Sequence, residues 1–521
     1  MDHAKQLVSA SRSIREARVN RRTFTGGIAV SAAALALGNR FVGAQDASPA
    51  AGTTPDGVTV ETVASGLNAP RYIAVDGDTV YFTESGKGGD SAVFATPAAG
   101  TPAAADPISQ RGYSGKLSAI AADGTVTAIV EDFLSYTFGA NGEIVGAAGL
   151  GLDGNGKAYV AVGAPGPNVS EIELTGDEDA IYEIDLATGE KKLLANTAPY
   201  EIENNPDPAT VDSNLYGAAF ADGKFYVADA GGNTVYVVDV ATSELSVFDI
   251  TGGVEAPFLG EAGNPLRGGA AEIDSVPGPV AVGPDGAIYV GLVTGGPFPA
   301  GLAPIYSYSP DGTRSVYASG LTMVGGLAFA SDGTLYATLI SSDFVTGAPG
   351  LLVRVGADGN HTVILDDLIV PAGIAFDADD TLYLANKSTG FTDGGEILKY
   401  TGITAVEGYA FAVPTADAGT AAATPEAAAT DGSAVTVKLE DVAFDQTEIT
   451  IAADTDVTFV FDNVGALPHD FVIDELSVNS GVVAPGGNAS VVINAPAGTY
   501  TYYCSQVGHR EAGMVGTLTV E

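Results

Sequence analysis

Alternating apolar and polar positions through the long middle of the chain predict short β-strands joined by tight turns. Six times, a strand of small apolar residues leads through a turn rich in Asp and Gly into a strand that contains a tyrosine. Asp-Gly between two apolar runs predicts a hairpin, because glycine readily adopts the positive φ that tight turns require. The six pairs are Pro70–Val75 with Val80–Phe82, Gly149–Leu152 with Tyr159, Gly217–Phe220 with Tyr226, Pro279–Val282 with Tyr289, Gly325–Phe329 with Tyr336, and Pro371–Phe376 with Tyr383.

The repetition of this unit predicts a β-propeller. Several short strands recurring at intervals of about 50 residues are typical of propeller blades. Six copies predict a six-bladed β-propeller over residues 58–412, in which Val58–Val63 pairs with the last blade and closes the ring.

Residues 434–521 carry a different pattern, in which the propeller unit does not recur. Alternation here predicts an antiparallel β-sandwich of ordinary domain size. The fold class predicted for the whole chain is therefore all-β, with a six-bladed β-propeller followed by a sandwich. The predicted strands of the sandwich are Val435–Leu439, Val457–Phe461, Val491–Asn494, Thr499–Tyr503 and Gly516–Val520.

The remaining segments are predicted to be linkers and a leader. Residues 45–57 and 413–433 are rich in Ala, Thr, Pro and Asp and lack apolar periodicity, which is typical of linkers. In residues 1–44, Arg21-Arg22 precedes the mild apolar run Gly27–Leu37, and small residues follow it. This segment resembles a twin-arginine (Tat) signal peptide, which implies export to the periplasm, the cell surface or the medium. Cleavage and retention as an anchor both stay open.

The net charge and the hydropathy of the chain exclude some classes of binding partner. The formal net charge is −42, from 22 Lys and Arg against 64 Asp and Glu. Such acidity argues against nucleic-acid binding and against attraction to anionic membranes, and it is typical of a soluble monomer with a basic partner. After the leader, no segment approaches 18 uninterrupted apolar residues, so no integral membrane segment is expected in the mature chain.

The rarest residues gather near the C-terminus. Cys504 is the only cysteine, so no intrachain disulfide can form. His509 and Met514 follow it at C-x4-H-x4-M spacing, and His469 lies upstream. Two imidazoles and a thiolate in one plane, with a weak axial thioether, suit copper. Zinc is an alternative, although structural zinc sites usually carry more thiolates, and a buried core cysteine without metal is another.

These residues, with Asn463 and the sequence His469-Asp470-Phe471, resemble the cupredoxins of the plastocyanin/azurin type, which are blue copper proteins. The resemblance implies a Greek-key sandwich and one type 1 copper ion. Val507 departs from the proline usual in that family, without removing a ligand. The implied metal ligands are His469, Cys504 and His509 in the equatorial plane and Met514 on the axis.

The propeller resembles the ScyD/ScyE family of the scytonemin cluster through the phrases GLNAPRYIAV and PAGIAF, which implies its fold but little about a substrate. Its inner strands are small and apolar, and no Glu, Asn and Asp triad like that of lactonase-type propellers is found. His361 is expected in a surface turn. Arg71 could hold an anionic ligand, although a surface or closure salt bridge is favoured. Glu84, Asp229 and Asn386 are expected to form hydrogen bonds at the rim.

One copper site and a single remaining histidine, His361, favour an electron carrier over an enzyme that reduces oxygen or nitrite. We expect an exported electron-transfer protein whose propeller docks a partner or ligand, with an unidentified protein as redox partner. Two alternatives stay open: a propeller dehydrogenase that passes electrons to the copper domain, and copper storage or delivery. The sequence leaves open the direction of electron flow, the potential and the propeller ligand.

Overall fold

The computed structural model describes residues 54–94, 109–138, 143–164, 172–209, 211–259, 263–344, 347–413, 434–440, 443–453, 455–464, 469–476, 478–481, 483, 487–504 and 514–521. The predicted leader, most of both predicted linkers, Val507 and His509 lie outside these residues. The chain divides into two compact units, which are described separately. In the described residues, no helix is long and apolar enough to cross a membrane.

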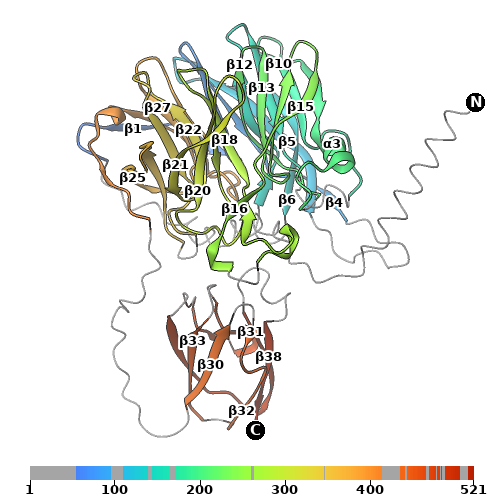
Figure 1. Ribbon diagram of the computed structural model, residues 1–521, viewed down its shortest axis with the longest axis vertical. Coiled ribbons are helices and arrows are strands. Elements are labelled where there is room, and N and C mark those ends of the chain that lie inside the picture. The colour runs from blue at the N-terminus through green and yellow to red at the C-terminus, as the bar shows by residue number, and fades with distance from the viewer. Residues whose placement is uncertain are drawn as a thin grey trace, which may run out of the picture. The chain divides into compact units, whose positions relative to one another are not determined.

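The larger unit contains six sheets that form the blades of a propeller (Figure 1). The first blade has β2 (Pro70–Asp76), β3 (Thr79–Glu84), β5 (Ser109–Ile120), β6 (Val126–Phe138) and β7 (Glu143–Val145), with β4 (Ser91–Val93) paired to β5. The second has β8 (Ala147–Leu152), β9 (Lys157–Val162), β10 (Ala180–Asp185) and β11 (Lys191–Asn196). The third has β12 (Leu215–Ala221), β13 (Lys224–Asp229), β14 (Thr234–Asp239) and β15 (Glu244–Ile250).

The remaining blades follow the same plan. The fourth has β18 (Pro277–Val282), β19 (Ile288–Leu292), β20 (Ala303–Tyr308) and β21 (Arg314–Leu321). The fifth has β22 (Val324–Phe329), β23 (Leu335–Leu339), β24 (Gly350–Arg354), β25 (Thr362–Leu368) and β29 (Tyr409–Ala410). The sixth has β26 (Ile374–Phe376), β27 (Leu382–Asn386), β28 (Gly395–Thr401) and β1 (Thr59–Leu67). Connecting segments form α3 (Thr197–Asn204), β16 (Gly253–Glu255), β17 (Glu272–Asp274), η4 (Pro257–Leu259), η5 (Pro265–Arg267) and η6 (Ile403–Ala405).

The inner strands form a closed ring, in the order β2, β8, β12, β18, β22, β26 and back to β2. Each inner strand pairs antiparallel with the tyrosine-containing strand that follows it, as the sequence predicts. The ring closes through β1, which pairs antiparallel with β28 and lies, in blue, among the orange strands of the last blade (Figure 1). The predicted six-bladed propeller is thus confirmed.

Small inner-strand residues are required because neighbouring blades approach closely at the centre. A methyl group on Gly149 in the second blade would lie 2.7 Å from Ala218 Cβ in the third. One on Gly217 in the third blade would lie 2.6 Å from Pro279 Cα in the fourth. Larger side chains at these positions would push the blades apart, since close-packed interiors absorb added volume poorly.

The smaller unit is a sandwich of two sheets (Figure 1). One sheet has the order β31 (Ala443–Phe444), β30 (Ala434–Glu440), β33 (Val457–Asn463), β36 (Asn488–Ile493). The other has the order β32 (Glu448–Ile451), β38 (Val515–Val520), β37 (Gly498–Tyr503), β34 (Val472–Ile473), β35 (Val478–Asn479), with η7 (Asp474–Leu476) beside it.

All five predicted strands of the sandwich are present, but the expectation of a purely antiparallel sandwich is wrong. β30 pairs parallel with β33, and β32 pairs parallel with β38. These pairs join strands that are not connected by a hairpin, so alternation within each strand carries no information about their direction.

Candidate metal centre

His469 and Cys504 lie together in the interior of the sandwich, and both side chains are fully buried. His469 is held by its backbone, which exchanges two hydrogen bonds with Val483: Val483 N donates to His469 O at 2.7 Å, and His469 N donates to Val483 O at 3.1 Å. Asn463 Nδ2 donates to the same Val483 oxygen at 2.7 Å. Cys504 directly follows β37, whose alternation buries Tyr502 and Cys504 on one face.

Met514 lies at the other end of the segment that begins at Cys504. The Cys504 backbone N–H donates to Met514 O at 3.1 Å, which fixes the two ends of the intervening loop side by side. Met514 is fully buried and belongs to the same apolar core as Cys504. His509 lies between them in the sequence, outside the described residues. The structure therefore brings together His469, Cys504 and the Met514 end of the loop.

The separation of the two donor atoms fits a shared metal ion. His469 Nδ1 lies 3.9 Å from Cys504 Sγ, which is long for a hydrogen bond. A metal bound at about 2.0 Å to nitrogen and about 2.3 Å to sulfur, with about 120° between the bonds, would hold these atoms about 3.7 Å apart. The donor set of imidazole, thiolate and thioether favours copper over zinc.

The surroundings of Cys504 hold its sulfur in place. The Asp470 backbone N–H donates to Cys504 Sγ at 3.4 Å, a contact that stabilises negative charge on sulfur. Phe471, the next residue, stacks against Tyr502 and packs at a tilt against Phe461, with ring centroids 4.6 Å apart in both pairs. Aromatic rings packed beside the segments that carry the donors restrict their movement.

Glu84, Asp229 and Asn386 of the propeller bind backbone N–H groups near the ends of their strands. Glu84 Oε2 accepts the Asn68 backbone N–H at 2.7 Å, and Asp229 Oδ1 accepts that of Asn214 at 2.8 Å. Asn386 Oδ1 accepts the Ile369 N–H at 2.9 Å. These contacts confirm the hydrogen-bonding roles expected for the three residues. In the described part of the propeller, no three His, Cys, Asp or Glu side chains are arranged to hold a metal ion.

The expectation for His361 is wrong. Its ring is buried, with Nε2 2.8 Å from Ser319 O, and Gly356 N donates to Nδ1 at 3.3 Å. The tautomer with hydrogen on Nε2 satisfies both contacts, so the His361 ring joins its turn to Ser319. It is buried because β21 lies against its turn, a contact that the turn sequence does not reveal.

The salt bridge favoured for Arg71 is also wrong. Arg71 is only 4% exposed, and among the described residues it pairs with no carboxylate within 4.0 Å. The sequence reading also missed Glu143, a buried acid whose pKa is raised to about 8 by burial, partly offset by Arg71. The burial of Glu143 could have been suspected because this acid directly precedes the apolar residues Ile144 and Val145.

Comparison with known proteins agrees with the geometry of the sandwich. Residues 413–520 match the family described as "Cupredoxin-like domain". The chain is 42% identical over 82 residues to plastocyanin from Prochlorothrix hollandica, covering 14% of this chain and 59% of that protein. It is 42% identical over 76 residues to plastocyanin from Vicia faba, covering 12% of this chain and 74% of that protein. The chain thus spans little more than half the length of the first of these relatives.

A solved structure described as a putative oxidoreductase (glucose dehydrogenase) from Thermus thermophilus aligns with 66% of this chain and 100% of its own, at 16% identity and a TM-score of 0.39.

Proposed function

Through its C-terminal domain the chain belongs to the cupredoxin family, and we propose that it is an exported electron-transfer protein with one type 1 copper site. The observation that carries the proposal is the buried pair of His469 and Cys504, with donor atoms 3.9 Å apart beside Met514. The proposed ligands are His469, Cys504, His509 and Met514.

The residues around the site support electron transfer. Copper supplies a one-electron redox couple when bound. Val483 fixes the His469 backbone, and the Asp470 N–H donates to Cys504 Sγ at 3.4 Å. Donors held in this way change position little between oxidation states, so little reorganisation opposes electron transfer. Burial of all three described donors keeps bulk water from the sulfur.

The leader and the propeller complete the proposal. The resemblance of residues 1–44 to a twin-arginine signal supports export. Residues 413–433 have the composition of a flexible linker, which suits a copper domain that visits a separate protein. The propeller provides the docking surface for that partner or for a ligand. An overall charge of −42 favours a basic partner surface.

The test is the visible spectrum of the purified chain loaded with Cu(II), compared with a Cys504→Ser variant. We expect an intense blue absorption from thiolate-to-copper charge transfer in the wild type and none in Cys504→Ser. His361→Asn is the matched histidine control and should keep the colour, whereas His469→Asn should lose it. A wild-type chain that binds metal but stays colourless, or colour that survives Cys504→Ser, would contradict the proposal.

A further inference from the structure

The centre of the propeller contains a cluster of polar side chains around Arg71. Four groups accept hydrogen bonds from the guanidinium: Ser85 Oγ from Nε at 3.0 Å, Tyr216 OH from Nη1 at 3.2 Å, and Ile144 O and Thr389 Oγ1 from Nη2 at 2.5 and 3.1 Å. Arg71 belongs to the first blade and Tyr216 to the third, which are not neighbours, so this contact crosses the middle of the ring. Arg71, Ser85, Glu143, Tyr216 and Thr389 are called the central cluster below.

Every direct partner of Arg71 in the central cluster is neutral. The acid that interacts with it electrostatically is Glu143, which is itself buried. Burial raises the pKa of Glu143 to about 8, which favours its neutral form. Among the described residues, the groups that accept hydrogen bonds from the Arg71 guanidinium are all neutral.

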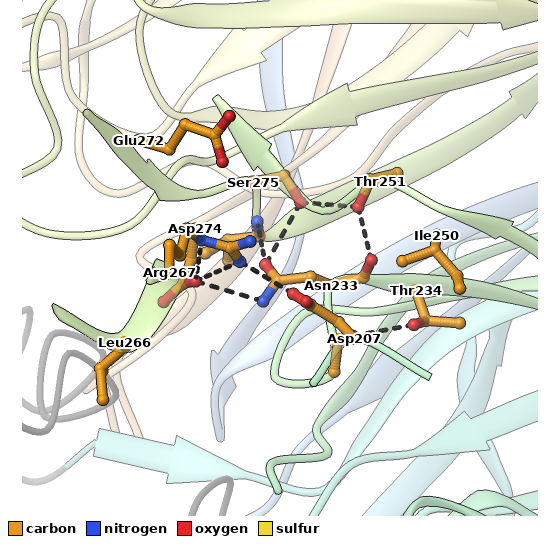
Figure 2. Close-up of polar contacts among 12 residues, drawn as sticks. Asp207, Asn233, Thr234, Ile250, Thr251, Leu266, Arg267, Glu272, Asp274 and Ser275 are labelled. Atoms are coloured by element: carbon orange, nitrogen blue, oxygen red, sulfur yellow. Dashed lines mark hydrogen bonds and ion pairs between the residues drawn. The ribbon is translucent and has the colours of Figure 1, made fainter. Parts of the chain in front are cut away.

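A second buried arginine shows what this fold does when a guanidinium only has to hold segments together. Arg267 Nη2 lies 2.8 Å from Asp207 Oδ2 and 2.5 Å from Asp274 Oδ1, and its side chain is 7% exposed (Figure 2). Two carboxylates thus compensate Arg267, while Arg71 at similar burial has none within 4.0 Å among the described residues. A buried charge without an opposite partner destabilises the folded state. A neutral residue could join the blades at lower cost.

We infer that the central cluster is a binding site for a small organic monocarboxylate, with Arg71 as the residue that recognises its charge. A guanidinium presents donors in one plane, which matches the two oxygens of a carboxylate. The single positive charge balances a monoanion, whereas a phosphate dianion would leave excess negative charge.

Tyr216 is the partly exposed member of the otherwise buried central cluster, and the centroid of its ring lies 5.4 Å from Arg71 Cζ. Tyr216 also packs edge-on against Tyr72, with ring centroids 5.7 Å apart. A rotation of Tyr216 would break its 3.2 Å contact with Arg71 and free a donor for the ligand. This site is independent of the copper centre.

The test measures the thermal unfolding of the propeller in the full chain with acetate or benzoate, against chloride at equal ionic strength. We expect each carboxylate to raise the melting temperature, because ligand that binds only the folded state stabilises it. The rise should disappear in Arg71→Met. It should persist in Arg314→Met, a control arginine paired with Asp249 at 2.7 Å on the outer part of the fourth blade.

Arg71→Lys tests the same point if Arg71→Met does not fold. The lysine keeps the charge but loses the planar donors, so at least a tenfold weaker apparent affinity for acetate is expected. No carboxylate effect in the wild type, an equal effect in Arg71→Met, unchanged affinity in Arg71→Lys, or an equal effect of phosphate would each overturn the inference.

Discussion

The two domains bury polar side chains in different ways. Among the described residues of the sandwich, the buried polar or charged side chains are Asn463, His469 and Asp470. His469 and Asp470 contact Cys504 Sγ, and Asn463 donates to Val483, which pairs with the His469 backbone. In the propeller such side chains are numerous and are spread along the chain from Arg71 to Thr389, and several accept hydrogen bonds from backbone N–H groups. Concentrated polar burial indicates one site with one task, while distributed polar burial indicates a scaffold.

Removing the central aromatic ring of the sandwich is expected to produce the largest effect. Phe471→Ala should lower the free energy of unfolding of the C-terminal domain by about 3–5 kcal/mol, because Phe471 is fully buried against Phe444, Phe461 and Tyr502. Copper affinity should fall with it, while the propeller transition stays in place. Calorimetry of the full chain measures both transitions, with Phe391→Ala as the matched change in the propeller. A shift of both transitions by Phe471→Ala would contradict independent cores.

Breaking the ion pairs of Arg267 should cost almost as much in the propeller. Arg267→Met leaves Asp207 and Asp274 without their cation, so we expect a loss of about 3 kcal/mol in chemical denaturation. The matched control is Arg314→Met, since Arg314 and Asp249 are partly exposed at 39% and 23%. That change should cost less than about 1 kcal/mol. Equal costs would show that burial does not decide the strength of these pairs.

Much of the fold and of the metal site could be predicted, because the blade pattern repeats along the chain and because the proposed ligands include the rarest residue types. The Asp-Gly turns recur six times, so each blade supports the assignment of the others, and Cys504 stood out as the only cysteine. The burial of His361 could not be predicted, because its partner Ser319 lies 42 residues earlier in the chain. The neutral surroundings of Arg71 come from residues up to 318 positions away. Contacts between residues so far apart in the sequence leave no pattern in the residues around either partner.

The stability of the propeller should depend on pH through its buried carboxyl groups. Burial raises the pKa of Glu143 and of Glu201 to about 8, from an ordinary value of 4.5. The stability that their protonated forms contribute is complete below about pH 4.5 and is lost as the pH rises through 8. The propeller melting temperature should therefore fall by several degrees between pH 5 and pH 9, as followed by circular dichroism. Glu143→Gln should reduce this slope, and an unchanged slope would contradict the assignment.

The smallest change in stability is expected from exchanging the proposed axial ligand. Met514→Leu conserves volume in the core and should cost less than about 1.5 kcal/mol. It should nevertheless change the reduction potential of the copper site, because a thioether donor is removed. Spectroelectrochemical titration measures this change. Met323→Leu alters a methionine that is equally buried in the propeller and should leave the potential as it is.

The pairing of β1 with β28 has a consequence for biosynthesis. Thr59 pairs with Thr401, so the first strand of the propeller waits for the last blade while more than three hundred residues are translated. During that interval its backbone donors and acceptors have no sheet to join, and the sixth blade lacks its outer strand. The ring can close only after β28 has been synthesised, so β1 stays an unpaired edge until then. A cut after β1 would break the covalent link between the closing strand and the rest of the ring.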